Sequence, residues 1–172
     1  GTLPATAVFQ QLRGLSETDK PRLARLGLRF GVESIYLPDL LKPAPIELRA
    51  LLWNLHHGAD GVFHAPPPAG RVAIDAVEGV PDEFWLAVGY RRLGGRVMRV
   101  DMVRNAAREG QFRINEEMLS LAGATREQMA AMLLDMNCKI VGEEADEDPE
   151  KPEIQIFERV RRQRGEGGQR DR

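Results

Sequence analysis

The sequence predicts a mixed α+β fold, mainly helical, with a small helix and hairpin unit followed by a winged-helix-like unit. Apolar residues recur at helical spacing around residues 48–55 and 129–136. Short apolar runs that flank glycines, at residues 28–37 and 90–100, predict hairpins. The last third has the order helix, strand, helix, helix, strand, long loop, strand, which is typical of winged helix-turn-helix domains.

The first 58 residues predict the helix and hairpin unit. Ser16 is placed to cap a short helix that ends at Gly27. The runs LRF and SIYL, on either side of residues 31–33, predict a small hairpin. A longer helix is expected from about Pro43 to Gly58, and the residues that give it helical spacing are Leu48, Leu51, Leu52 and Leu55.

A tryptophan, the three histidines and the single cysteine are the side chains of chemical interest in this sequence. Trp53 is expected in the core because a tryptophan must hide a large area. His56 and His57 fall in the last helical turn, where their partial positive charge suits the helix dipole, so we interpret them as capping residues. The spacing of His56, His57 and His64 does not match that of a metal-binding site. The single cysteine, Cys138, is expected to be a small buried hydrophobic residue.

The segment at residues 59–70 is expected to divide the chain. Three consecutive prolines and flanking glycines exclude regular structure there. We therefore expect a helix and hairpin unit over 1–58, a Pro/Gly-rich loop over 59–70, a winged-helix-like unit over 71–158 and a basic, disordered tail over 159–172. Within the third unit, the expected elements are a strand at 71–75, a helix at 81–89 and a hairpin around Gly94 and Gly95.

The C-terminal third carries the clearest local signals. A helix is expected to close at Gly110, a short strand to follow, and a second helix to open at Asn115 and close at Gly123. Thr125 and Gln128 predict a capping box for a third helix over 125–136, the position of a recognition helix. Its expected core face consists of Met129, Met132, Leu133 and Met136. Strands at 137–143 and 153–160 would then flank a wing at 144–152.

Composition and missing motifs exclude several classes of protein. The chain has 172 residues, and 24 Lys plus Arg stand against 26 Asp plus Glu, for a formal net charge of −2. The pattern G-x-x-x-x-G-K-[ST], which cradles nucleotide phosphates, is missing, and no serine stands in a nucleophile elbow. Apolar runs stay below the ~20 residues that cross a bilayer. We expect a cytoplasmic protein with no cofactor, no metal and no membrane contact.

The charges bear on nucleic-acid binding in opposite ways. Seven acidic residues and one lysine between Glu143 and Glu153 give the expected wing a formal charge of −6, which repels a phosphate backbone. The tail from Arg159 to Arg172 carries a formal +4, and such a segment can contact RNA or fold over the acidic wing. The candidate nucleic-acid-binding residues are Arg91, Arg92, Arg96, Arg99, Arg126, Arg159, Arg161, Arg162 and Arg164.

Two long segments carry a family resemblance. LGLRFGVESIYLPDLLKPAPIELRALLWNLHHG resembles the region just downstream of the motor core in large helicase-like proteins of alphaproteobacteria, relatives of the DExH helicase of the mitochondrial RNA degradosome. GYRRLGGRVMRVDMVRNAAREGQFRINEEMLSLAGATREQMAAMLLDMNCKIV resembles the later part of the same region. The resemblance covers about residues 22–142 and rests on structural motifs, so it transfers no catalytic residue. The acidic wing departs from what an accessory domain that grips nucleic acid would prefer.

The resemblance implies a non-catalytic C-terminal accessory module of an ATP-dependent nucleic-acid helicase. We expect it to pack on the motor lobes of the same polypeptide or to guide a strand, with single-stranded RNA as the second partner. The alternative is a protein-interaction or regulatory winged helix that binds no nucleic acid. A third possibility, a small free-standing enzyme, lacks a visible convergent polar set in the sequence.

Overall fold

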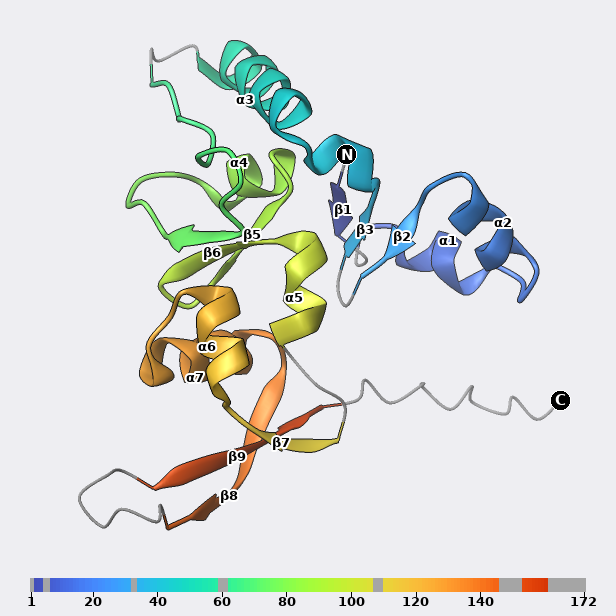
Figure 1. Cartoon of the computed structure of the whole chain (residues 1–172). Coiled ribbons are helices and arrows are strands. Elements are labelled where there is room, and N and C mark those ends of the chain that lie inside the picture. The colour runs from blue at the N-terminus through green and yellow to red at the C-terminus, as the bar shows by residue number, and fades with distance from the viewer. Residues whose placement is uncertain are drawn as a thin grey trace, which may run out of the picture.

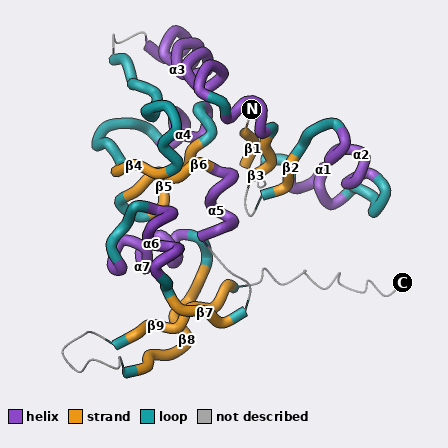
Figure 2. The backbone as a smooth tube through the Cα atoms, viewed as in Figure 1, coloured by secondary structure: helices purple, strands orange, loops and turns teal. Residues whose placement is uncertain are grey.

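Three small antiparallel sheets and the helices between them make up the chain in the computed structural model (Figure 1). The structure describes residues 2–4, 7–31, 34–58, 62–106, 110–145 and 153–160. Within these ranges, each sheet has three strands, and the backbone view shows the sheet of β7, β8 and β9 below the other two (Figure 2). The mixed α+β class expected from the sequence is confirmed.

The N-terminal sheet contains the predicted hairpin and one strand that the sequence did not indicate. Its hairpin strands pair antiparallel, with Phe30 opposite Ile35, and the additional strand pairs on the other side with Leu3 opposite Ile35. Before the hairpin, at the start of a short helix, the Ser16 N–H donates to Asp19 Oδ2 and the Asp19 N–H donates to Ser16 Oγ. The elements of this part are β1 (Thr2–Pro4), α1 (Phe9–Arg13), α2 (Asp19–Arg25), β2 (Arg29–Phe30) and β3 (Ser34–Tyr36).

The predicted long helix is present as α3 (Pro43–His57), preceded by a 3-10 turn, η1 (Pro38–Leu41). Proline occupies its first turn, where the missing backbone N–H costs nothing, and Gly58 ends it. The residues that α3 buries are Ile46, Ala50 and Asn54, and Trp53 is partly buried beside them. The expectation that Trp53 contributes to the core is confirmed.

The middle sheet lies between two hydrophobic cores. It contains β4 (Ala73–Asp75), β5 (Tyr90–Leu93) and β6 (Arg96–Arg99), and α4 (Asp82–Ala87) precedes the predicted Gly94–Gly95 hairpin. Successive strand residues point to opposite faces. Accordingly, Val97 packs with α3 and α4, whereas Met98 packs with the C-terminal helices.

This packing corrects the expected domain boundary at 59–70. Ile46 and Ala50, before that loop, share one core with Phe84, Trp85 and other residues after it. The loop therefore connects two parts of a single packing unit, because the apolar face of α3 finds its partners beyond the loop. The second core extends from Leu93 and Met98 in the hairpin to Phe157, in the strand at residues 154–159.

The C-terminal third has the predicted order of elements. Its sheet has the strand order β7-β9-β8, and its local signals are confirmed: Asn115 and Thr125 cap the two helices they precede, and Gly123 ends the first of them in the left-handed conformation. The predicted core face of methionines and leucine is fully buried, and so is Cys138. The elements are α5 (Val100–Ala106), β7 (Gln111–Arg113), α6 (Glu116–Ala122), α7 (Arg126–Asp135), β8 (Cys138–Glu144) and β9 (Ile154–Arg159).

Two expectations fall mainly outside the described residues. Most of the wing, residues 146–152, lies there, and so does the tail from residue 161 onward. Arg159, which was assigned to the tail, is instead the last residue of β9, paired with Cys138. Gly110 has a left-handed conformation, but the helix it was expected to close is described only to Ala106.

Candidate functional site

Four of the nine candidate nucleic-acid-binding arginines, Arg91, Arg92, Arg96 and Arg99, lie in the central hairpin. The strand register places Arg99 opposite Tyr90 and Arg92 opposite Val97, on the face toward α3 and α4. Arg91 and Arg96 lie on the other face, toward the C-terminal helices. Because the two faces are separated by the sheet, these four side chains do not form one continuous basic surface.

Three of these arginines form ion pairs within the chain. Arg92 Nε lies 2.7 Å from Asp82 Oδ1, and Arg96 Nη1 lies 2.6 Å from Asp75 Oδ1. Arg99 holds Asp101 with two bonds, of 2.7 and 3.0 Å, and this hydrogen bonding raises the pKa of Arg99. Arg96 is nearly buried, with 10% of its side chain exposed. A phosphate would have to displace a carboxylate at each of these positions.

The helix in the recognition position, α7, docks on the turn of the same hairpin. The Gly94 backbone N–H donates to Asp135 Oδ2 at 2.6 Å. A side chain on Gly94 would meet the Ala131 Cβ at 3.2 Å, so the turn and helix are in close contact. Arg91 also reaches the Asp135 carbonyl, at 3.5 Å. A helix that reads a major groove must keep its outer residues accessible to base edges. Here Ala131 and Asp135, near the C-terminal end of α7, contact the hairpin turn, and both of them and Leu134 remain exposed to solvent.

The remaining candidate arginines are dispersed. Arg126, at the start of α7, donates to the Ile114 carbonyl and lies 3.5 Å from Glu116. Arg159 is the last residue of β9, where it pairs with Cys138. Arg161, Arg162 and Arg164 lie outside the described residues. The carboxylate of Glu144, at the base of the acidic wing, is held by Arg113.

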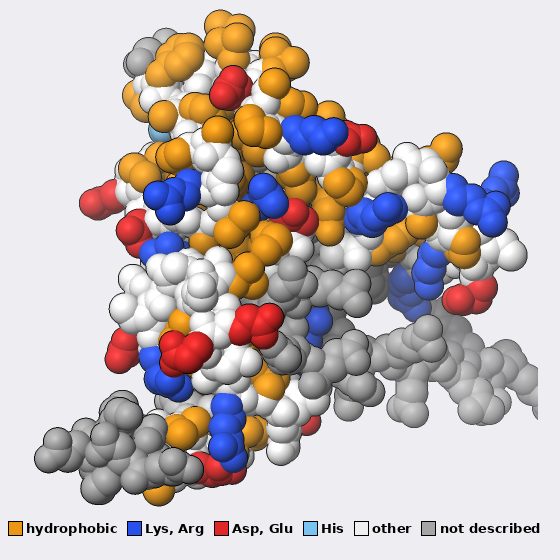
Figure 3. Space-filling view, in the orientation of Figure 1, with side chains coloured by type: hydrophobic (Ala, Val, Ile, Leu, Met, Phe, Trp, Pro, Cys, Tyr) orange, Lys and Arg blue, Asp and Glu red, His pale blue; other side chains and the backbone are white. Residues whose placement is uncertain are grey.

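An exposed leucine face on α3 is an apolar surface that the packing of the described residues leaves uncovered. The four leucines whose spacing predicts the helix are 47 to 67% exposed, and the residues that α3 buries lie on its opposite side. Space-filling shows apolar side chains gathered over α3 (Figure 3). A helix that is apolar on both sides is normally buried on both sides. We call Leu48, Leu51, Leu52 and Leu55 the leucine face.

A side-chain clamp that the sequence did not indicate fixes the Pro-rich segment against α3. Asn54, which is buried, donates from Nδ2 to the His64 carbonyl and accepts from the His64 N–H, each at 2.9 Å. The His64 ring packs beside Trp53 and Phe84, and His57 stacks on Trp53 with ring centres 4.1 Å apart. The three histidines therefore serve packing and capping, with His57 Nδ1 3.0 Å from the Trp53 carbonyl oxygen.

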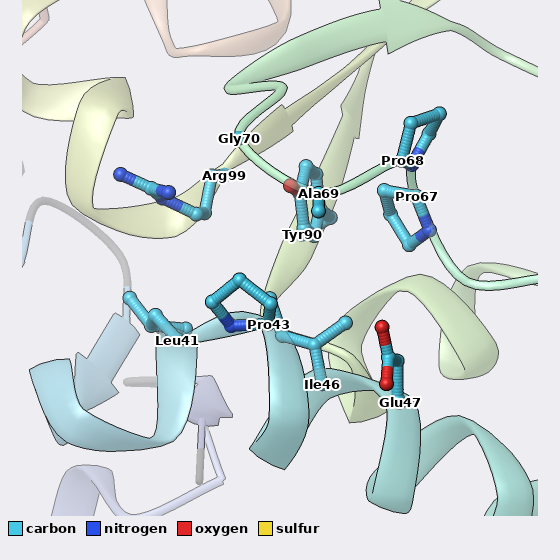
Figure 4. Close-up of a pocket in the computed structure, with 10 residues that line it drawn as sticks. All are labelled: Leu41, Pro43, Ile46, Glu47, Pro67, Pro68, Ala69, Gly70, Tyr90 and Arg99. Carbon is cyan, nitrogen blue, oxygen red and sulfur yellow. The ribbon is translucent and has the colours of Figure 1, made fainter.

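A small pocket lies where this segment crosses the start of α3 (Figure 4). Its volume is about 70 Å³, whereas sites for cofactors and drug-sized ligands measure roughly 300–1,000 Å³. Glu47 and Arg99 are its charged residues, and Arg99 is already paired with Asp101. The pocket has room for a few waters.

The part of the chain that the structure describes contains no group of three or more His, Cys, Asp or Glu side chains placed to hold a metal ion. Burial raises the pKa of Cys138, which disfavours the reactive thiolate form. None of the described helices combines the length and apolar character that crossing a membrane requires. Comparison of the chain with protein-family models, curated proteins and solved structures gives no match.

Proposed function

We propose that the chain is a non-catalytic accessory module of an ATP-dependent nucleic-acid helicase. In this proposal, residues 71–158 form a winged-helix-like unit that packs on protein, and the basic C-terminal segment supplies a weak contact to single-stranded RNA. The sheet order β7-β9-β8, with α6 and α7 between β7 and β8, supports the winged-helix assignment. The resemblance over residues 22–142 supports the link to a helicase.

The observation that carries the proposal is the docking of α7 on the central hairpin. The Gly94–Asp135 hydrogen bond and the contact with Ala131 hold the C-terminal end of this helix against the hairpin turn. The ion pairs of the hairpin arginines also support the proposal, because a groove-binding module needs cations that are free to contact phosphates. In such a module the helices stabilise the fold, and other segments contact the nucleic-acid strand.

The test of the helicase part uses the 172-residue chain and separately expressed DExH motor lobes of the class it resembles. We expect saturable association by sedimentation velocity and a change in the unwinding rate of the motor. No association at concentrations up to about 100 micromolar, where interactions of about −5.5 kcal/mol still register, would overturn this part of the proposal.

The RNA part is tested by fluorescence anisotropy with single-stranded RNA at several salt concentrations. We expect weak, salt-dependent binding that is lost when the chain is truncated after Val160, which leaves β9 intact. Arg126→Gln, at the start of α7, is the matched control and is expected to bind like the parent chain. Binding that survives the truncation but is lost in Arg126→Gln would show that α7 reads nucleic acid and would overturn the packing role.

The leucine face favours a second candidate function, a protein-interaction module that binds no nucleic acid. Interfaces are depleted of charged residues at their centres, and the four central positions of this face are all leucine. The anisotropy experiment separates the two candidates. Absence of RNA binding by the intact chain, together with protein binding through α3, is the result that this second function predicts.

A further inference from the structure

We infer that residues 9–30 form a second contact for the phosphates of single-stranded RNA. We call these residues the basic lobe. It consists of α1, α2 and β2, and its two helices project from the body of the molecule (Figure 1). The inference rests on the RNA part of the proposed function and extends it to a new surface, because none of the nine candidate arginines lies in the lobe.

The formal charge of the basic lobe is opposite to that of the rest of the chain. Five cationic residues stand against two carboxylates, for a formal charge of +3. Because the whole chain has a formal charge of −2, the remaining residues together carry −5. A basic region on an otherwise acidic protein attracts a polyanion to that region. The charged residues of the lobe are Arg13, Glu17, Asp19, Lys20, Arg22, Arg25 and Arg29.

Three arginines of the lobe lie around one end of α2. Arg22 and Arg25 are three positions apart, so they lie on the same face of the helix. The Arg29 guanidinium reaches the C-terminal end of the helix, where its Nη1 donates to the Ala24 carbonyl at 3.0 Å. All three arginines are exposed, and space-filling shows Lys and Arg side chains gathered at α2 (Figure 3). They form one cationic surface that is open to solvent.

These arginines are paired more weakly than the hairpin arginines. Arg22 lies 3.9 Å from Asp19, and 78% of its side chain is exposed. The Asp19 carboxylate accepts instead from the Ser16 hydroxyl and N–H, at 2.6 and 2.9 Å, and these hydrogen bonds lower the pKa of Asp19. Among the described residues, Arg25 forms no ion pair. Long, exposed ion pairs contribute little. A phosphate can therefore contact this surface without displacing a tightly held carboxylate.

The make-up of the lobe favours phosphates over a protein partner. The centre of a protein interface is depleted of charged residues and contains buried anchors. In the lobe, Leu26 is the one large hydrophobic side chain described as exposed, and the cations surround it. The guanidinium group matches phosphate oxygens with two parallel hydrogen bonds. Contacts to phosphates carry no sequence information, so we expect little preference for RNA sequence.

The lobe adds to the contact made by the basic C-terminal segment and does not replace it. Non-specific binding to nucleic acid typically has a dissociation constant of about 1–100 micromolar. Three arginines alone should bind more weakly than this, so the chain truncated after Val160 should still show no measurable binding. When the C-terminal segment holds the strand, the contacts of the lobe become intramolecular and strengthen the complex.

The test is fluorescence anisotropy of the 172-residue chain with oligouridylate between about 50 and 200 mM salt. Arg22→Gln/Arg25→Gln/Arg29→Gln should weaken binding several-fold at the lowest salt. It should also reduce the slope of log affinity against log salt by about 2, because each phosphate contact to a single strand contributes about 0.7. Lysine at the same three positions keeps the charge and should preserve the slope. Arg22→Gln/Arg25→Gln keeps the bond from Arg29 to α2 and should reduce the slope by about 1.4.

The matched control is Lys42→Gln/Arg71→Gln/Lys139→Gln, which removes three exposed cations outside the lobe. It changes the net charge of the chain by the same amount and should leave the slope close to that of the parent chain. Circular dichroism checks that each variant folds, as expected for substitutions of exposed side chains.

The outcomes separate this inference from the proposed function. A slope that is unchanged when the arginines of the lobe are replaced would overturn the inference and leave the proposed function standing. An equal loss in the control variant would also overturn it, because binding would then be spread over the whole surface. Absence of RNA binding by the parent chain at the lowest salt would contradict both. Binding that depends on the lobe and survives truncation after Val160 would support the lobe and contradict the role of the C-terminal segment.

Discussion

The Asp135 carboxylate in α7 accepts a hydrogen bond from the backbone N–H of Gly94, 2.6 Å away at the turn of the central hairpin. The two residues are 41 positions apart, and their contact joins the middle sheet to the C-terminal helices. Gly94 has a positive φ of 56°, and a side chain there would press on Ala131. The turn and the helix therefore form a single structural joint.

Gly94→Ala should destabilise the protein by about 1–2 kcal/mol, because alanine is strained in the left-handed conformation and its Cβ would lie 3.2 Å from that of Ala131. The measurement is the free energy of unfolding from urea denaturation. Gly95→Ala is the matched control, since a Cβ at Gly95 meets open space. Equal effects of the two substitutions would contradict a close contact between turn and helix.

Thr125→Ala should lower the free energy of unfolding by about 1 kcal/mol. Thr125 Oγ1 accepts from the Gln128 N–H at 3.3 Å, and Gln128 Oε1 accepts from the Thr125 N–H at 3.0 Å, so two backbone donors of α7 depend on this box. Ser120→Ala, at an exposed position of α6, serves as the control and should change stability by less than about 0.5 kcal/mol. An unchanged urea midpoint for Thr125→Ala would show that the box contributes nothing.

Asn54→Ala should free the Pro-rich segment from α3. The substitution leaves the N–H and the carbonyl of His64 without their partner in a half-buried position, at a cost of about 1–3 kcal/mol. The direct readout is hydrogen exchange of the His64 amide, which should become faster. Asn54→Asp keeps an acceptor for that amide and should protect it better than alanine does. Unaltered exchange in Asn54→Ala would exclude the clamp.

Tyr90 should make stability fall at alkaline pH. Burial raises the pKa of Tyr90 above its ordinary value of 10.0, and its hydroxyl donates to the Arg71 carbonyl. In the unfolded chain this tyrosine ionises near pH 10, while in the folded chain it stays protonated. Unfolding therefore releases a proton above pH 10, so the Tyr90 contribution is complete below pH 10 and declines as the pH rises toward the folded pKa.

Urea midpoints between about pH 8 and 11 measure this effect, with Tyr90→Phe as the comparison, since it lacks the ionising group near pH 10. Cys138→Ala is the background for both proteins, because burial also raises the pKa of Cys138 and adds its own decline. Parallel pH profiles for the tyrosine and phenylalanine proteins would contradict the prediction.

Features that act over a few residues were predictable from the sequence. The capping box at Thr125 and Gln128, the Asn115 cap, the Gly94–Gly95 turn and the buried methionine side of α7 are all present as expected. The candidate arginines were identified by residue type alone. Their separation onto two faces of a sheet, and their pairing with carboxylates, became visible only in the structure.

The sequence by itself determined several local boundaries, among them the starts of α6 and α7 and the Gly94–Gly95 turn, because caps and turns operate between near neighbours. Only the tertiary structure decided which side of α3 is buried. Both sides are apolar, so periodicity cannot choose between them, and the choice depends on Phe84, Trp85 and Val97, which follow much later in the chain. Those distant residues pack against Ile46 and Ala50, so the leucine face remains exposed to solvent.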